Sequence, residues 1–194
     1  MINEIGSKTF IFTLDDIISE QECEMYKSII DEHANNKANY GVTENVICNY
    51  LSFTDTSDEI LSKIKIIFET IIKAMNNHPN VLARPLGIEN GSLRKITDKT
   101  RMHTDHIIPG KQDKFHKDSV RMYSIIIALN DDYEGGELHF PQQDVTVKLK
   151  RGQAILFPPY WTHPHGTNFL QNSTCRYTIN TWAIGIKSQT HVDK

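Results

Sequence analysis

Residues 175–186 read CRYTINTWAIGI, the clearest strand pattern in the chain. Successive side chains of a strand point to opposite faces of its sheet. The alternation therefore separates two faces: Arg176, Thr178, Asn180 and Trp182 on one, and Tyr177, Ile179, Thr181 and Ala183 on the other. An arginine on a buried face is costly unless it meets an anion, whereas on a solvent-exposed face it is an ordinary surface charge. The alternation alone leaves both interpretations open.

Further strand patterns lie upstream of this stretch, beginning at about residue 81. Short apolar or alternating runs are separated by turn residues such as Gly135 and Gly136, as expected for strands joined by turns. The predicted strands cover residues 92–96, 122–129, 137–140, 145–150 and 154–157. Many short strands of this kind indicate a sandwich or a jelly-roll barrel.

Two amphipathic helices are predicted in the first half of the chain. Each begins at a capping box, formed by Ser19 with Glu22 and by Thr56 with Glu59. One stripe of residues then follows the helical period in each helix: Cys23, Tyr26, Ile29, Ile30 and His33 in the first, and Ile60, Leu61, Ile64, Ile67, Phe68, Ile71, Ile72 and Met75 in the second. The second helix should end at His78, because proline follows it.

Helices followed by strands predict an α+β fold. The 194 residues suit one domain, residues 1–194, with helical support at about 15–78 and a β core at about 81–187. The net charge of −3 argues against a nucleic-acid partner. No apolar run approaches the roughly 20 residues that span a membrane, and no secretory signal is visible. Three widely spaced cysteines fit a reducing cytoplasm, where we expect the protein; the oligomeric state is left open.

Three His-x-Asp motifs offer metal ligands: His103 with Asp105, His116 with Asp118, and His191 with Asp193. Two histidines and one carboxylate form the facial triad of non-haem Fe(II) oxygenases. His191 lies near the chain end and His116 in a polar loop, so only His103, which follows a predicted strand, suits the role. His163 and His165 both follow a buried strand and are candidates for the third ligand. We favour His165, flanked by Pro164 and Gly166, and expect His163 behind the site or at the surface.

An ordered set of motifs resembles the prolyl 4-hydroxylase-like branch of the Fe(II)/2-oxoglutarate dioxygenases. The motifs are HTD (103–105), a strand from Arg121 to Asn130, EGGEL (134–138), GQAILFP (152–158), PHG (164–166) and RYTINTW (176–182). Each motif is weak alone, but their order over nearly half of the chain is specific.

The resemblance implies a double-stranded β-helix (jelly-roll) that binds Fe(II), 2-oxoglutarate and O₂, with ascorbate as a candidate reductant. It implies that His103, Asp105 and His165 bind the metal and perform catalysis, and that Arg176 binds the far carboxylate of 2-oxoglutarate. Arg121 and Trp182 match positions beside the substrate. The polar stretch at residues 107–119 suits a lid over that substrate.

Two departures from the family pattern affect the cosubstrate pocket. The tyrosine that often precedes His-x-Asp is missing, and Arg94, Lys95 and Ile96 stand in that region. Ala128 occupies a site that is tyrosine in some relatives. We expect Ser124 and Asn180 to supply the missing contacts.

The resemblance predicts a hydroxylase of a prolyl peptide or protein, which couples decarboxylation of 2-oxoglutarate to C–H hydroxylation. A free amino acid or small metabolite is the alternative substrate. Two other classes stay open: a zinc hydrolase using the same three ligands, and a non-catalytic β-helix binding module.

Overall fold

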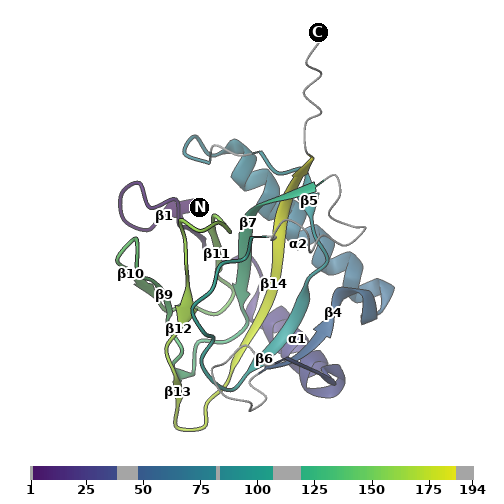
Figure 1. Cartoon of the computed structure of the whole chain (residues 1–194). Coiled ribbons are helices and arrows are strands. Elements are labelled where there is room, and N and C mark those ends of the chain that lie inside the picture. The colour runs from purple at the N-terminus through teal and green to yellow at the C-terminus, as the bar shows by residue number, and fades with distance from the viewer. Residues whose placement is uncertain (1, 39–47, 82–83, 107–118, 187–194) are drawn as a thin grey trace.

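The computed structural model describes residues 2–38, 48–81, 84–106 and 119–186 (Figure 1). Its helices are α1 (Glu20–His33), α2 (Asp58–Asn77) and the short 3₁₀ helix η1 (Phe53–Asp55). The main sheet contains, in spatial order, β1 (Ile2–Glu4), β2 (Phe12–Leu14), β11 (Ala154–Phe157), β7 (Ser119–Ala128), β14 (Arg176–Ile186), β6 (Ser92–Ile96), β4 (Cys48–Ser52) and β3 (Asn36–Ala38), and β5 (Gly87–Ile88) also pairs with β14. Two small sheets contain β10 (Val145–Val147), β9 (Leu138–Phe140) and β12 (Gly166–Thr167), and β13 (Leu170–Gln171) with β8 (Glu134–Gly135).

The long strand β14 lies at the centre of the main sheet, between β7 and β6 (Figure 1). All three strands are antiparallel, and their register sets Asn180 opposite Ile126 and Ser92, and Trp182 opposite Ser124. Residues opposite each other in an antiparallel pair share a face. The polar residues of β14 therefore share one face with Ser124 and Ser92.

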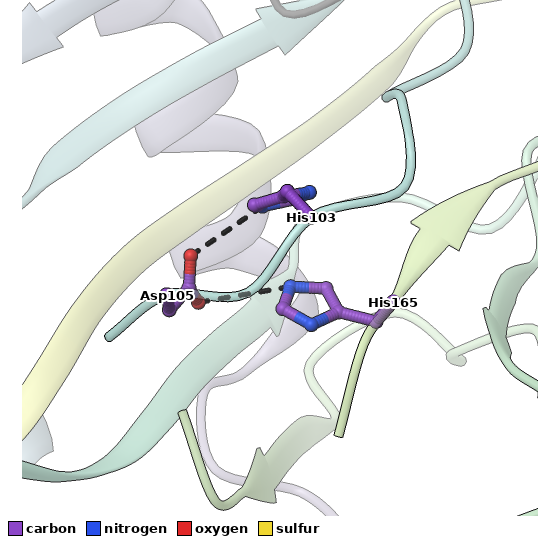
Figure 2. Close-up of side chains that lie close together, drawn as sticks. All are labelled: His103, Asp105 and His165. Carbon is purple, nitrogen blue, oxygen red and sulfur yellow. Dashed lines mark ion pairs between the residues drawn. The ribbon is translucent and has the colours of Figure 1, made fainter. Parts of the chain in front are cut away.

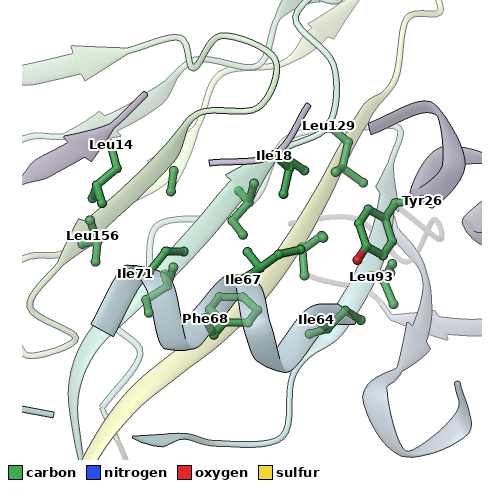
Figure 3. Packing of buried hydrophobic residues seen from close by; sticks show 14 of the residues in the cluster. Leu14, Ile18, Tyr26, Ile64, Ile67, Phe68, Ile71, Leu93, Leu129 and Leu156 are labelled. Atoms are coloured by element: carbon green, nitrogen blue, oxygen red, sulfur yellow. The ribbon is translucent and has the colours of Figure 1, made fainter. Parts of the chain in front are cut away.

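Two apolar clusters cover the opposite faces of the main sheet. Ile125 and Ile127 of β7 belong to the cluster that includes the buried sides of α1 and α2. Their neighbours Ile126 and Ala128 belong to the cluster that includes β9 and β10. Figure 3 shows α2 packed on the sheet through its apolar stripe. Each isoleucine or phenylalanine buried in this way contributes roughly 1.5–3 kcal/mol to stability. Helix α2 therefore covers the outer face of the main sheet, and the inner face, which carries the polar residues of β14, is turned toward β9 and β10.

The combination of two helices with a mostly stranded remainder agrees with the α+β prediction. Strands β6 and β11 have the predicted bounds, and α1 begins at the predicted Ser19–Glu22 capping box. No helix in the described part of the chain is long and apolar enough to cross a membrane. The predicted lid lies in residues 107–118, outside the described residues, and only its last residue, Ser119, is seen, at the start of β7.

Three sequence predictions are wrong in detail. Strands do not begin at residue 81, because β1–β4 precede it and β4 pairs directly with β6. The N-cap of α2 is Ser57, and the Thr56 hydroxyl instead donates to the Phe53 carbonyl, so Thr56 and Glu59 form no capping box. His33 is not buried: its side chain is 62% exposed in the last turn of α1.

The capping box of α1 yields a stability prediction. The Ser19 hydroxyl accepts from the Glu22 N–H, and the Glu22 carboxylate accepts from the Ser19 N–H. Ser19→Ala should lower the free energy of unfolding by about 1 kcal/mol, because N-terminal N–H groups lose their partner. Urea denaturation measures the change in the free energy of unfolding. Thr70→Ala, at an exposed interior position of α2, is the control and should leave stability equal or slightly higher. Equal effects of the two substitutions would contradict a capping role.

Candidate metal centre and its cavity

His103 and His165 are backbone partners across two antiparallel segments. The His103 N–H donates to the His165 carbonyl and the His165 N–H donates to the His103 carbonyl, both at 2.9 Å. Paired residues on adjacent extended segments carry their side chains on the same side. The two imidazoles consequently lie together, with ring centroids 4.4 Å apart.

Asp105 reaches the same point from the segment after His103. Its N–H donates to the Pro159 carbonyl at 3.0 Å, which ties it to the loop that leads to His165. One carboxylate oxygen lies 3.4 Å from His103 Nε2 and the other 3.7 Å from His165 Nε2, as Figure 2 shows. The three potential ligand atoms lie within 4.8 Å of one another, and no other such group of histidine, cysteine or acidic side chains occurs in the described ranges.

Backbone carbonyls hold both imidazoles in a metal-ready orientation. His103 Nδ1 lies 2.8 Å from the Arg101 carbonyl, and His165 Nδ1 lies 3.1 Å from the His163 carbonyl. An Nδ1–H donated to a carbonyl leaves the Nε2 lone pair free, the usual support of a metal-bound histidine. The Ser124 hydroxyl donates to Asp105 Oδ2 at 2.6 Å and fixes the carboxylate.

The site favours a charged carboxylate beside a neutral imidazole. Burial alone would raise the pKa of Asp105, but the hydrogen bond from His103 and the charges of both histidines hold it well below its usual range. Burial lowers the pKa of His165. For His103 the attraction of Asp105 outweighs burial and raises the pKa. Metal ligands must be deprotonated, so a cation would displace any proton on His103.

His163 lies behind the centre and does not join it. Its side chain is buried, with Nε2 2.8 Å from the Thr9 carbonyl and Nδ1 2.9 Å from the Thr162 hydroxyl. It supports the site through its backbone carbonyl, which accepts a hydrogen bond from Nδ1 of His165. The expectation that His163 sits behind the site is therefore met, and its alternative place at the surface is not.

A cavity of about 170 Å³ adjoins the three ligand side chains. Seven of the eight residues predicted from sequence line it: His103, Asp105, Ser124, His165, Arg176, Asn180 and Trp182. Arg121 does not line it but stacks its guanidinium 3.6 Å from the centre of the Trp182 ring. A larger groove, about 500 Å³ between α2 and β5, has no such convergence of ligand side chains.

Arg176 lines this cavity. Its Nη1 donates to the Gly136 carbonyl at 2.8 Å, and its buried Nε has no hydrogen-bond partner. No carboxylate of the described residues pairs with it, and burial lowers its pKa. A buried guanidinium without a counter-charge is costly, and a bound carboxylate relieves that cost.

The fold of this chain resembles solved prolyl hydroxylases. A viral collagen prolyl hydroxylase from Paramecium Bursaria Chlorella virus-1 superposes with a TM-score of 0.66 over 93% of this chain and 98% of that one, at 17% identity. A Pseudomonas putida prolyl-4-hydroxylase gives 0.63 over 91% and 93%, at 16% identity. A Trichoplax adhaerens prolyl hydroxylase, in complex with a hypoxia inducible factor peptide, gives 0.65 over 91% and 84%, at 15% identity.

Sequence comparison identifies the family. Residues 92–184 match the 2OG-Fe(II) oxygenase superfamily, and this range contains all three ligand residues and Arg176. This segment, nearly half of the chain, is a 2OG-Fe(II) oxygenase domain. A PKHD-type hydroxylase from Crocosphaera subtropica is 23% identical over 159 residues, which cover 79% of this chain and 70% of that protein.

This oxygenase also contains site residues that sequence reasoning missed. Glu89 forms a bidentate pair with Arg121, and Arg94 lines the cavity together with Arg176. The sequence marks Arg94 only as a residue in a region where a tyrosine is usual in the family, and nothing in the local sequence marks Glu89. The other two His-x-Asp motifs, at 116–118 and 191–193, lie outside the described residues.

Gly166 allows the two ligand-bearing segments to approach each other. A Cβ at Gly166 would lie 3.0 Å from the Thr100 carbonyl oxygen and 3.1 Å from the Met102 nitrogen. Gly166→Ala should push His103 away from His165 and weaken Mn(II) binding by roughly tenfold, the size typical of a lost supporting contact. Calorimetric titration measures the affinity. Gly87→Ala, where nothing lies within 4 Å of the added Cβ, is the matched control. Unchanged affinity in Gly166→Ala would contradict this account of the close approach.

Proposed function

We propose that the chain is an Fe(II)- and 2-oxoglutarate-dependent hydroxylase that acts on a prolyl peptide or protein. One observation carries the proposal: a His–Asp–His group shares one cavity with an arginine that has no carboxylate partner among the described residues and whose buried Nε makes no hydrogen bond. The first suits a divalent cation and the second suits an anion. We further propose that residues 1–194 act as one domain and that its sheets form the double-stranded β-helix expected from the sequence.

His103, Asp105 and His165 would hold the iron. Two imidazoles and one carboxylate leave three positions open, which suits Fe(II) that must also accept a cosubstrate and O₂. When bound, the iron would supply the activation of O₂ that couples 2-oxoglutarate decarboxylation to hydroxylation. The protein's own part is orientation: the Arg101 and His163 carbonyls fix the imidazoles, and the Ser124 hydroxyl fixes the carboxylate.

Arg176 would bind the far carboxylate of 2-oxoglutarate. Its Nη1 donates to the Gly136 carbonyl, and it is the first residue of β14, whereas Trp182, farther along the strand, lies opposite Ser124, which donates to Asp105. Asn180 lies between Arg176 and Trp182 on the same face of β14, and its Oδ1 accepts from the Thr178 hydroxyl. We propose Asn180 and Ser124 as further contacts with the cosubstrate, and ascorbate as the reductant.

The proposed substrate contacts are Trp182, which lines the cavity, and Arg121, which stacks on it. The solved relatives include a collagen prolyl hydroxylase and a prolyl hydroxylase bound to a peptide fragment, which supports a prolyl peptide for this chain. A free amino acid remains the second candidate, because the cavity is small.

Loss of a metal ligand should abolish turnover. His103→Ala and Asp105→Ala should each reduce succinate formation from 2-oxoglutarate to the level without enzyme, because two remaining ligands hold iron poorly. Mass spectrometry of succinate measures this. His33→Ala changes an exposed histidine on α1 and should retain parental activity. Succinate formation by His103→Ala with iron still bound would contradict the assignment.

Loss of Arg176 should weaken binding of one carboxylate selectively. Arg176→Ala should raise the Kd for 2-oxoglutarate about tenfold to a hundredfold, since a hydrogen bond to a charged group contributes about 1.5–3 kcal/mol. Calorimetry on the Mn(II)-loaded protein measures this without turnover. The matched ligand is 2-oxopentanoate, which lacks the far carboxylate, and its Kd should not change. Equal weakening of both ligands would refute the role of Arg176.

The substrate class is tested by turnover. An array of prolyl peptides, compared with free amino acids, should show hydroxylation only with peptides, detected as a mass increase of one oxygen. Hydroxylation of a free amino acid with no peptide turnover would replace the first candidate by the second.

A further inference from the structure

All three nitrogens of the Arg121 guanidinium are engaged by the protein itself. Nε and Nη2 donate to the two carboxylate oxygens of Glu89, at 2.7 and 2.5 Å, and Nη1 donates to the Asp105 carbonyl at 2.7 Å. One face of the guanidinium lies 3.6 Å from the Trp182 ring centre. Arg121 therefore links the backbone of a proposed metal ligand to a residue that lines the cavity.

A β-bulge turns Arg121 toward the site. In regular pairing Met122 would lie opposite Ile184, but the register shifts after Ala183 and Arg121 takes that place. Ile184 is two residues from Trp182 on β14, so the shift brings Arg121 onto the face that carries Trp182 and Ser124. Bulges commonly re-aim a side chain beside an active site.

Glu89 is held against the edge of β14 that is opposite to β7. Its N–H donates to the Trp182 carbonyl at 2.9 Å, and its carbonyl accepts from the Thr181 hydroxyl at 2.6 Å. The side chains of Arg121 and Glu89 are only 16% and 15% exposed. Solvent screens such a pair less than a surface pair, and its bidentate geometry fixes the plane of the guanidinium.

We propose that Glu89 is a positioning residue for the metal-binding segment and acts through Arg121. The Glu89 carboxylate fixes the guanidinium, which in turn holds the Asp105 carbonyl and the Trp182 ring. Without the carboxylate, the mostly buried guanidinium of Arg121 loses the partner of its Nε and Nη2, and it turns away from Asp105. The effect on metal binding rests on the proposed function, whereas the effect on the Asp105 segment does not.

Hydrogen exchange in the metal-free protein tests the segment directly. Glu89→Ala should speed exchange of the Asp105 amide, which donates to Pro159, by about tenfold or more, because local opening becomes easier. Glu89→Gln keeps the shape but loses the charge and should give a smaller increase. Asp31→Asn is the control: it weakens the ion pair with Lys95 and the hydrogen bonds from Tyr177, which packs in the apolar cluster with α1, and it should leave this amide unchanged. Unchanged exchange at Asp105 in folded Glu89→Ala would overturn the proposal.

Metal affinity supplies the second readout. Glu89→Ala should weaken Mn(II) binding about tenfold to a hundredfold, as loss of a supporting contact does, while Asp31→Asn lowers thermal stability at most. A drop in Tm without loss of Mn(II) affinity would show that Glu89 is merely structural. Failure of the parent chain to bind Mn(II) would refute the proposed function instead, and the exchange measurement would still decide the role of Glu89.

Discussion

Two reciprocal backbone hydrogen bonds between His103 and His165 bring the site together. They join the segment after β6 to the segment before β12, which are more than sixty positions apart in sequence, and they place both imidazoles on one side. Asp105 follows two residues later, where its N–H reaches the Pro159 carbonyl. Gly166 makes this approach possible because a side chain there would meet the facing backbone. The close approach of the two segments thus determines the geometry of the centre.

The cavity beside the three ligand residues contains groups that suit an anion as well as groups that suit a cation. The large sheet buries apolar residues against α1 and α2 on its outer face, so its inner face is free to carry Arg176, Asn180 and Ser124. Its lining includes a carboxylate and two imidazoles, and also a guanidinium whose buried Nε has no hydrogen-bond partner. A molecule with a chelating end and a second carboxylate complements both groups, and 2-oxoglutarate is such a molecule. The match of residues 92–184 to the 2OG-Fe(II) oxygenase superfamily agrees with this complementarity.

Local sequence patterns predict the bounds of single strands and the face on which each side chain lies. The bounds of β11 follow from an apolar run, and the alternation in β14 places Arg176 and Trp182 on one face. Contacts between distant segments carry no such signal. Glu89 and Arg121 are 32 positions apart and meet only because of the bulge at Met122, and the partner of His163 is the carbonyl of Thr9. Strands β1–β4 have three to five residues, too few for a period to stand out, and are specified by their neighbours in the sheet.

The most direct test of the whole account is a crystal structure of the protein grown without oxygen in the presence of Fe(II) and 2-oxoglutarate. The account predicts one metal ion bonded to Nε2 of His103, Nε2 of His165 and a carboxylate oxygen of Asp105. It also predicts the far carboxylate of 2-oxoglutarate on the guanidinium of Arg176. Iron bound elsewhere, or 2-oxoglutarate bound with its far carboxylate away from Arg176, would contradict the account.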